Sequence, residues 1–146
     1  MRIYPSFLPV IPDEPRAEDF RVIDVDEHRG QGVEVLRPFR AGDVLFRMNG
    51  VLRDHVTQYT LQVGPHAHLD DPYFAGKVLH SCDPNSRLDP ESRLYTAVRD
   101  IEPGELLTMD YDETEDFLYR AFDCKCGAVG CRGYVAGRLA GMPVAV

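Results

Sequence analysis

Four cysteines and their spacing constrain the fold of this chain more than any other sequence feature. Three of them, Cys124, Cys126 and Cys131, lie within the stretch FDCKCGAVGC, residues 122–131. The fourth, Cys82, lies far upstream in LHSCDPN. The chain has 146 residues, which suits one domain with one hydrophobic core. A link between the two cysteine segments would therefore join distant parts of a single small fold.

The pattern C-x-C-x4-C is typical of a metal site. Thiolates bind Zn²⁺ strongly in tetrahedral sets of four, and closely spaced ligands can reach one ion from a single loop. Gly127 and Gly130 let this loop wrap tightly, and Cys82 is the only other thiolate available as a fourth ligand. The spacing is not the C-x-x-C of a redox pair. Four thiolates would close the site, so we predict a structural zinc ion.

Charge and hydropathy narrow the functional class. The formal net charge is -8 and the sequence pI is about 5.0, whereas nucleic-acid binding needs a basic face. We therefore expect no direct nucleic-acid partner, and an acidic surface suits a basic partner better. No run approaches the roughly 20 apolar residues of a membrane span, and prolines interrupt the apolar patch at the start of the chain, unlike a signal peptide. We predict a cytoplasmic protein with no membrane partner, in a reducing compartment where clustered cysteines bind metals.

Short β-branched runs separated by turn residues indicate a mostly β, loop-rich domain. Strands are expected at VIDV and VEVL within residues 21–36, at YTLQVG in 59–64, and on both sides of a tight turn at Pro103 and Gly104. Gly30 and Gly32 mark positions where the backbone needs a positive φ or a close approach.

Two segments lack a clear strand pattern. Residues 1–19 are rich in proline and are expected to be an extended lead-in rather than a core element. The stretch EDFLYRAF, residues 115–122, is expected to form one short helix.

Four motifs, in order, resemble those of SET-domain protein-lysine methyltransferases with a post-SET zinc tail. A run of four in one order is much more specific than any one of them. We expect a short bacterial-style member, because the sequence shows no pre-SET cysteines or accessory domains. The motifs are RGQGV (29–33) for the glycine motif, LHSCDPN (79–85) for N-H-S-C-x-P-N, GELLTMDYD (104–112) for G-E-E-L-T-x-D-Y, and CKCGAVGCRG (124–133) for the post-SET cysteines.

The resemblance implies a fold, a division of the chain and an activity. The family fold is a β-clip of small curved sheets around a pseudoknot, in which the D-Y region threads beside the N-H-S-C segment. It implies a lead-in at 1–19, a SET domain at 20–115 and a post-SET zinc-binding tail at 116–146. The implied activity is methyl transfer from S-adenosylmethionine to a lysine side chain of a protein or peptide. The acidic run DYDETED, residues 110–116, would attract a basic peptide of this kind.

The resemblance also assigns roles to individual residues. Tyr111 is the expected catalytic residue, with its hydroxyl positioning the amine and the sulfonium. Asn85 and Asp110 are expected to be structural members of the knot. The expected cofactor-binding residues are Arg29, Gly30, Gln31, Gly32, Leu79, His80 and Ser81. The expected zinc ligands are Cys82, Cys124, Cys126 and Cys131.

Two positions depart from the family pattern. Leu79 stands where the family usually has an Asn that holds the amino acid end of the cofactor, and Arg29 is a candidate to compensate. Met48 stands where the family often has a Tyr that narrows the lysine channel, and Tyr95 or Tyr73 is a candidate to fill that space. These departures motivate an alternative, a catalytically inactive SET-like protein-binding module.

A third hypothesis is a different metalloenzyme. The stretch HAHLDD offers His66, His68 and Asp70 at ligand-like spacing, and a catalytic metal needs three protein ligands and an open position. One tightly held metal ion would fit the first two hypotheses, whereas a second stoichiometric ion would fit the third.

Overall fold

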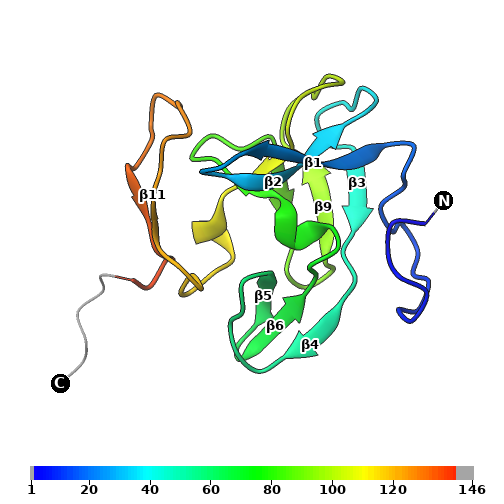
Figure 1. Ribbon diagram of the computed structural model, residues 1–146, viewed down its shortest axis with the longest axis horizontal. Coiled ribbons are helices and arrows are strands. Elements are labelled where there is room, and N and C mark those ends of the chain that lie inside the picture. Colours follow the sequence, from blue (N-terminus) through cyan, green and yellow to red (C-terminus); the bar gives the residue numbers. More distant parts are fainter. Residues whose placement is uncertain (1, 141–146) are drawn as a thin grey trace.

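The computed structural model describes residues 2–140, which form short strands and two 3₁₀ helices (Figure 1). The mostly β class predicted from the sequence is confirmed. No helix in these residues is long and apolar enough to cross a membrane. The helices are η1 (Ala75–Lys77) and η2 (Tyr111–Glu113). The strands are β1 (Phe20–Asp26), β2 (Gly30–Val35), β3 (Val44–Arg47), β4 (Val51–Arg53), β5 (Thr60–Gly64), β6 (Ala67–Asp70), β7 (Leu79–His80), β8 (Ser86–Leu88), β9 (Leu94–Ala97), β10 (Thr108–Met109), β11 (Phe122–Asp123) and β12 (Tyr134–Val135).

The strands assemble into several small sheets instead of one large sheet. The predicted pair VIDV and VEVL forms the antiparallel β1-β2 ribbon, and two three-stranded sheets have the orders β3-β9-β8 and β4-β6-β5. Two-stranded pairings join β10 to β7 and β11 to β12. In Figure 1, β11 and the N-terminal segment lie at opposite ends of the molecule.

A parallel pairing threads one motif beside another. Strand β10 runs parallel to β7, with Thr108 opposite Leu79. Asn85 is 3% exposed; its amide donates to the Leu106 carbonyl at 2.9 Å and its oxygen accepts from the Thr108 N–H at 2.8 Å. These bonds satisfy main-chain groups of two half-buried residues. They give Asn85 the structural role in the knot that the sequence predicted.

Aromatic side chains fill the core. Phe20, Phe39, Phe46, Phe74 and Tyr95 are all at most 2% exposed. The ring of Phe20 stacks on Phe39 with centroids 5.5 Å apart, and Phe46 stacks on Tyr95 at 4.4 Å. Because each buried aromatic side chain contributes about 2–3 kcal/mol of hydrophobic stabilisation, this cluster fixes β1, β3 and β9 against η1.

The N-terminal segment is part of this core, so the prediction of a lead-in outside the core is wrong. Tyr4 and Leu8 are only 3% and 5% exposed. The Tyr4 hydroxyl donates to Asp71 Oδ2 at 2.6 Å and accepts from the Asn49 N–H at 3.0 Å. Prolines keep this segment out of regular structure, but they do not prevent the apolar residues between them from packing inward.

The helix expected at EDFLYRAF is also absent, and that prediction is wrong. The only helical turn nearby is η2, which the Asp110 side chain caps by accepting from the Asp112 N–H at 3.0 Å. Beyond it, Phe117 and Tyr119 are 55% and 57% exposed. Side chains this exposed add little packing, and a short isolated helix is marginal without such packing.

Candidate active site and cysteine cluster

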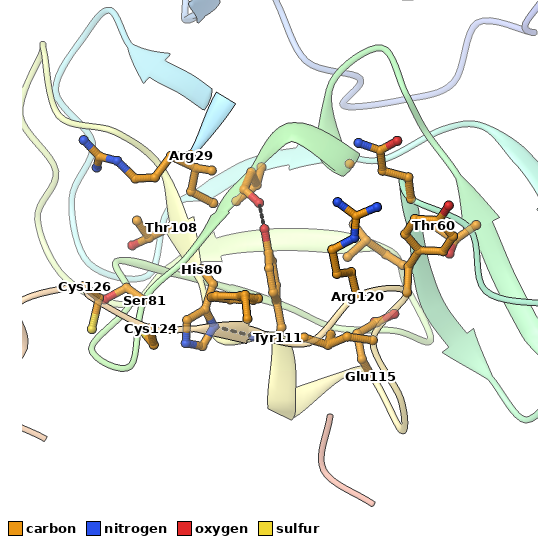
Figure 2. A pocket seen from close by; sticks show the side chains of 18 of the residues that line it. Arg29, Thr60, His80, Ser81, Thr108, Tyr111, Glu115, Arg120, Cys124 and Cys126 are labelled. Atoms are coloured by element: carbon orange, nitrogen blue, oxygen red, sulfur yellow. Dashed lines mark hydrogen bonds between the residues drawn. The ribbon is translucent and has the colours of Figure 1, made fainter. Parts of the chain in front are cut away.

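A cavity of about 470 Å³ opens where the knot meets the C-terminal tail (Figure 2). Its volume falls within the roughly 300–1,000 Å³ typical of small-molecule sites. Strand β7, strand β10, helix η2 and the segment around β11 all contribute to its walls. The predicted catalytic and cofactor-binding residues that line it are Arg29, Leu79, His80, Ser81 and Tyr111.

Tyr111 forms a fixed wall of this cavity. It begins η2, and its hydroxyl donates to the Val78 carbonyl at 2.6 Å (Figure 2). Burial raises the pKa of Tyr111 well above its ordinary value, so the hydroxyl stays protonated. Because its single proton is committed to Val78, the oxygen lone pairs are left to accept from a ligand.

His80 connects the cavity to the cysteine cluster. The Tyr111 N–H donates to His80 Nδ1 at 3.1 Å, so the ring proton belongs on Nε2. Nε2 lies 3.4 Å from the Cys82 sulfur. Burial lowers the pKa of His80, which favours this neutral ring.

Gly30, Gln31 and Gly32 do not line the cavity, although Arg29 of the same motif does. Gly30 has a φ of +73° at the start of β2, and the Gln31 amide donates to Asp24 at 3.3 Å. A Cβ on Gly32 would lie 3.1 Å from Leu79 Cδ1. Of the two alternatives predicted for both glycines, Gly30 has the positive φ and Gly32 has the close approach. The close approach of Gly32 is to the Leu79 side chain, and cofactor binding by all three motif residues stays a prediction.

The two departures from the family pattern fall in different places. Leu79 and its candidate substitute Arg29 line the same cavity. Met48 is 1% exposed in the core, and neither Tyr95 nor Tyr73 is among the residues that line the cavity. That one of these two tyrosines narrows the lysine channel in place of the family tyrosine stays a prediction.

Sequence analysis missed Glu115, which lies on the cavity wall on the far side of Tyr111 from Ser81 (Figure 2). It is 3% exposed, and Oε2 accepts from the Gln62 N–H at 2.8 Å and from the Thr114 hydroxyl at 2.7 Å. Burial raises its pKa. The available signal was its position four residues after Tyr111, which puts the two residues one turn apart.

The other carboxylates of the acidic run are paired within the chain. Four ion pairs to three arginines partly neutralise the run, which argues against its predicted role in attracting a basic peptide. These pairs are Asp110 with Arg132 at 2.7 Å, Asp112 with Arg132 at 3.1 Å, Glu113 with Arg87 at 2.8 Å and Asp116 with Arg138 at 2.7 Å.

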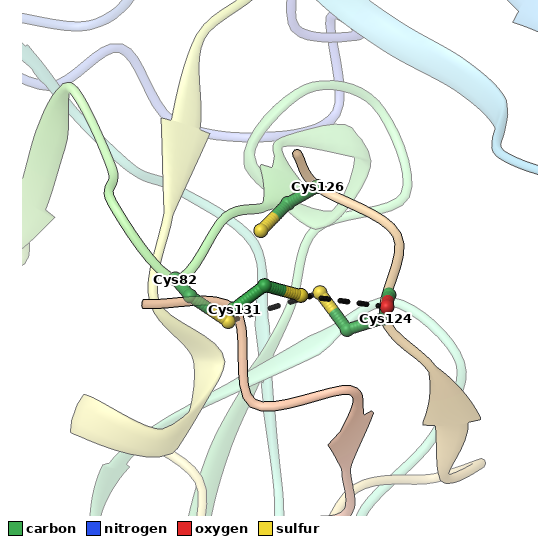
Figure 3. A group of neighbouring side chains, drawn as sticks. All are labelled: Cys82, Cys124, Cys126 and Cys131. Atoms are coloured by element: carbon green, nitrogen blue, oxygen red, sulfur yellow. Dashed lines mark hydrogen bonds between the residues drawn. The ribbon is translucent and has the colours of Figure 1, made fainter. Parts of the chain in front are cut away.

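The four cysteines meet at one point, as predicted (Figure 3). Their sulfur atoms all lie within 4.8 Å of one another, and the Cys82 and Cys124 sulfurs are 3.8 Å apart. A tetrahedral zinc site with Zn–S bonds of about 2.3 Å puts neighbouring sulfurs about 3.8 Å apart. A disulfide would need about 2.05 Å, and all four residues are free cysteines. The donor set and its spacing therefore fit zinc.

The second metal site required by the metalloenzyme hypothesis is not formed. Within residues 2–140, the cysteine cluster is the only group of three or more potential ligands at metal-binding separations. His66 lies in a turn with a φ of 55°, His68 and Asp70 lie on β6, and Asp70 pairs with Arg53 at 2.7 Å.

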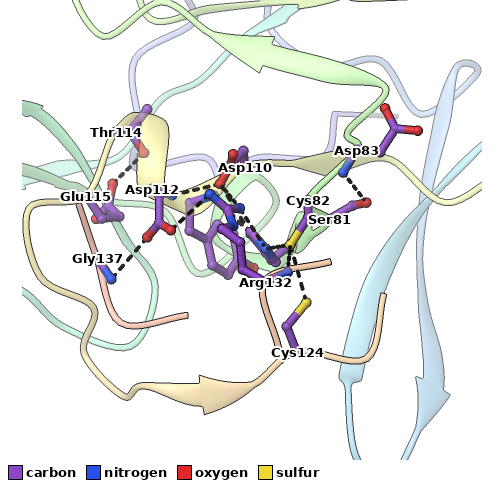
Figure 4. Close-up of polar contacts among 12 residues, drawn as sticks. Ser81, Cys82, Asp83, Asp110, Asp112, Thr114, Glu115, Cys124, Arg132 and Gly137 are labelled. Carbon is purple, nitrogen blue, oxygen red and sulfur yellow. Dashed lines mark hydrogen bonds and ion pairs between the residues drawn. The ribbon is translucent and has the colours of Figure 1, made fainter. Parts of the chain in front are cut away.

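Arg132 joins the tail to the segment that carries Tyr111 (Figure 4). Its N–H donates to the Cys82 sulfur at 3.4 Å, and its guanidinium donates to Asp110 Oδ1 at 2.7 Å. The predicted post-SET tail, as far as residue 140, is thus docked by cysteines and by an arginine that follows the last of them. Residues 141–146 of that predicted tail lie outside the described residues.

The family model for the SET domain matches residues 30–112 of this chain. The chain belongs to the SET domain family. It is 25% identical over 134 residues to histone-lysine N-methyltransferase ASHH2 of Arabidopsis thaliana, covering 75% of this chain and 8% of that protein. It is 30% identical over 83 residues to methyltransferase flvH of Aspergillus flavus, covering 56% of this chain and 47% of that protein. The SET-domain chain thus spans less than half the length of either relative.

Solved structures agree with this assignment. KRYPTONITE in complex with mCHG DNA and SAH matches with a TM-score of 0.64 and 26% identity, covering 81% of this chain and 29% of that one. KRYPTONITE in complex with mCHH DNA, H3(1-15) peptide and SAH matches with a TM-score of 0.60 and 26% identity, covering 79% and 29%. The SET-domain fold predicted from the four motifs is confirmed.

Proposed function

We propose that this SET-domain protein is an S-adenosylmethionine-dependent protein-lysine N-methyltransferase. The observation that carries the proposal is the cavity, where residues from separate motifs meet around the fixed hydroxyl of Tyr111. Relatives named as histone-lysine methyltransferases and solved neighbours with SAH support it. The neighbour that contains an H3 peptide supports a lysine-bearing protein or peptide as the substrate. A cytoplasmic location and the absence of nucleic-acid contact stay predictions from the sequence.

The cavity walls suit the chemistry of an amine nucleophile. S-adenosylmethionine supplies a methyl group on a sulfonium, and a neutral amine displaces it in line. A free lysine amine has a pKa near 10.4, so partly apolar walls that include Leu61, Val78 and Phe122 favour its loss of a proton. The Tyr111 oxygen accepts from the amine and sets its direction, which is the positioning this reaction needs.

Residues on one side of Tyr111 would hold the methyl donor. Arg29, His80 and Ser81 lie on that side, and Leu79 also lines the cavity. Arg29, which pairs with Asp26 at 2.8 Å, is the cationic group that would face a carboxylate there. The Asn contact that Leu79 cannot make would cost about 1–3 kcal/mol, or about one to two decades of affinity. Arg29 offsets part of that loss.

A structural zinc ion is part of the proposal. Cys82, Cys124, Cys126 and Cys131 would hold it, supported by the sulfur spacing. Since Cys124 and Cys126 also line the cavity, the metal site would hold that wall in place. Four thiolates leave no open position for a reactant.

The first test is a calorimetric titration of the zinc-loaded protein with S-adenosylmethionine and with S-adenosylhomocysteine. We expect one micromolar site per chain for each, which would mean that the Leu79 departure is compensated. Folded protein with one zinc ion and no binding would instead favour the inactive SET-like binding module.

A Tyr111→Phe variant tests the proposed catalytic residue. Removing the hydroxyl should lower turnover on the order of 10²-fold because the amine loses its positioning group, while S-adenosylhomocysteine still binds. The assay transfers a radiolabelled methyl group to core histones. Tyr134→Phe is the matched control, since Tyr134 is exposed and does not line the cavity. Wild-type turnover by Tyr111→Phe would contradict the assignment.

A further inference from the structure

Glu115 is the buried carboxylate of the cavity. Of the two acidic residues that line it, Asp123 is exposed, whereas Glu115 is 3% exposed. The Glu115 N–H donates to the Tyr111 carbonyl at 2.9 Å, so the two residues share one turn of backbone. A carboxylate at such a depth is costly unless hydrogen bonds or a cation compensate it.

The two oxygens of Glu115 have different surroundings. Oε2 accepts from the Gln62 N–H and from the Thr114 hydroxyl, so it anchors the side chain. Oε1 makes no hydrogen bond or ion pair with any residue of 2–140. It is also not fully buried, because the fully buried polar atoms without a partner in this part of the chain belong to other residues. Oε1 is therefore left open to the cavity.

No arginine of the described chain forms an ion pair with this carboxylate. Arg138 pairs with Asp116, and the exposed Arg120 lines the cavity without an ion pair to Glu115 among the described residues. A cation that entered the cavity would thus meet an unpaired carboxylate oxygen in a partly desolvated place, where charge-assisted hydrogen bonds are strong.

The position of Glu115 indicates whether this cation would belong to the methyl donor or to the methyl acceptor. Figure 2 shows Glu115, Thr60 and Arg120 on one side of Tyr111, with Arg29 and Ser81 on the other. The second side is the one proposed to hold the methyl donor. The acidic side is therefore available to the methyl acceptor, and the Tyr111 hydroxyl lies between the two.

We propose that Glu115 Oε1 binds the charged nitrogen of the methyl acceptor as it enters, before the amine loses its proton and reacts, so that the cavity selects a primary alkylammonium group. This inference rests on the proposed function and adds a specificity-determining residue to it. On this inference the protein recognises the cationic head group of its substrate through Glu115, not through the other carboxylates of the acidic run.

A Glu115→Gln variant isolates the open oxygen. The amide oxygen of Gln can still accept from Gln62 and Thr114, while its NH₂ group replaces Oε1 and turns an acceptor into a donor. Glu113→Gln is the matched control, because Glu113 belongs to the same acidic run but pairs with Arg87 and does not line the cavity.

The probe is n-butylammonium chloride, a mimic of the lysine side chain, titrated by NMR with and without S-adenosylhomocysteine. The neutral mimic n-butanol is titrated in parallel. We expect Glu115→Gln to weaken n-butylammonium binding by about tenfold or more, equivalent to about 1.4 kcal/mol. Glu113→Gln should bind it like wild type, and n-butanol should bind all three proteins equally.

The outcomes separate this inference from the proposed function. Equal n-butylammonium affinity in wild type and Glu115→Gln, or no binding to wild type, overturns the role of Glu115 even if S-adenosylhomocysteine binds. Failure of S-adenosylhomocysteine to bind overturns the proposed function, and with it the identification of the cation as a methyl acceptor. If Glu115→Gln does not fold, the wild-type comparison decides: a preference of less than about tenfold for n-butylammonium over n-butanol overturns the inference.

Discussion

Residues 2–115 and the tail, residues 116–140, both line the cavity, but they bury very different amounts of apolar side chain. The first region contains the aromatic cluster of Phe20, Phe46 and Tyr95. In the described part of the tail, only Cys124 and Val135 are buried. The tail's large exposed apolar side chains are Phe117, Tyr119, Val129, Tyr134 and Leu139.

The difference shows that hydrophobic burial cannot hold the tail. Strands β11 and β12 have two residues each, and two-stranded ribbons are marginal in water on their own. What remains is the cysteine cluster, the ion pairs of Arg132 and Arg138, and a few hydrogen bonds such as that from the Gly137 N–H to Asp112. The wall of the cavity that contains Phe122 would therefore depend on bound metal, while the wall that contains Tyr111 depends on the core.

Metal removal should produce the largest difference between the two regions, because it should unfold the tail and leave the core intact. Structural zinc contributes about 10–16 kcal/mol in small zinc-binding peptides, far more than the tail's other contacts. We expect a chelator, or Cys131→Ser, to abolish hydrogen-exchange protection at the Cys124 and Val135 amides and to weaken S-adenosylhomocysteine binding. The Phe46 and Tyr95 amides should keep their protection. Unchanged zinc content in Cys131→Ser would contradict the four-cysteine site.

Asn85→Ala should have the opposite pattern, with a damaged core and an intact metal site. The change leaves the Leu106 carbonyl and Thr108 N–H without their partner, at a cost of about 3 kcal/mol. Urea unfolding measures the loss. Asp83→Ala, at an exposed position two residues earlier, is the control and should stay within about 0.5 kcal/mol of wild type. A loss of zinc from folded Asn85→Ala would mean that the two regions are not separable.

The same contrast explains what could be predicted from the sequence. The β1-β2 ribbon follows from local alternation and turn residues, and the cysteine cluster follows from ligand chemistry and spacing. The knot could not be derived from periodicity, because the pairing of Thr108 with Leu79 is non-local. It was anticipated only because the motifs resemble those of a known family.

The failures have a common cause, since each depended on what a side chain meets in three dimensions. Composition gave no sign that Tyr4 would meet Asp71 in the core. The EDFLYRAF pattern predicted a helix, but Phe117 is 55% exposed and gives such a helix little packing. Glu115 was read as one more charge in a surface run, because sequence does not tell which carboxylate of a run points inward.

Tyr4→Phe tests whether the N-terminal segment belongs to the core region. The variant keeps the buried ring but loses the bond to Asp71 and the acceptor of the Asn49 N–H. The buried Asn49 N–H then lacks an acceptor, and Asp71 Oδ2 keeps only the Ala75 N–H at 3.0 Å. We therefore expect a loss of about 2 kcal/mol in the free energy of unfolding. Tyr119→Phe, at an exposed tail position, should have almost no effect. If Tyr4→Phe is equally stable, the segment is an attachment to the core and not a part of it.

Arg132→Ala should have the smallest effect on stability. It tests whether the contact of Arg132 with Asp110 links the position of the tail to cofactor binding. Its pairs with Asp110 and Asp112 are partly exposed, with 38% of the arginine side chain accessible, so we expect a loss of about 1 kcal/mol or less. Arg138→Ala is the matched control, because Arg138 pairs with Asp116 and does not follow a cysteine. Calorimetry with S-adenosylhomocysteine is the informative measurement. Equal affinities in the two variants would mean that the cysteines alone position the tail. A selective loss of affinity in Arg132→Ala would mean that the contact of Arg132 with Asp110 couples the position of the tail to that of Tyr111.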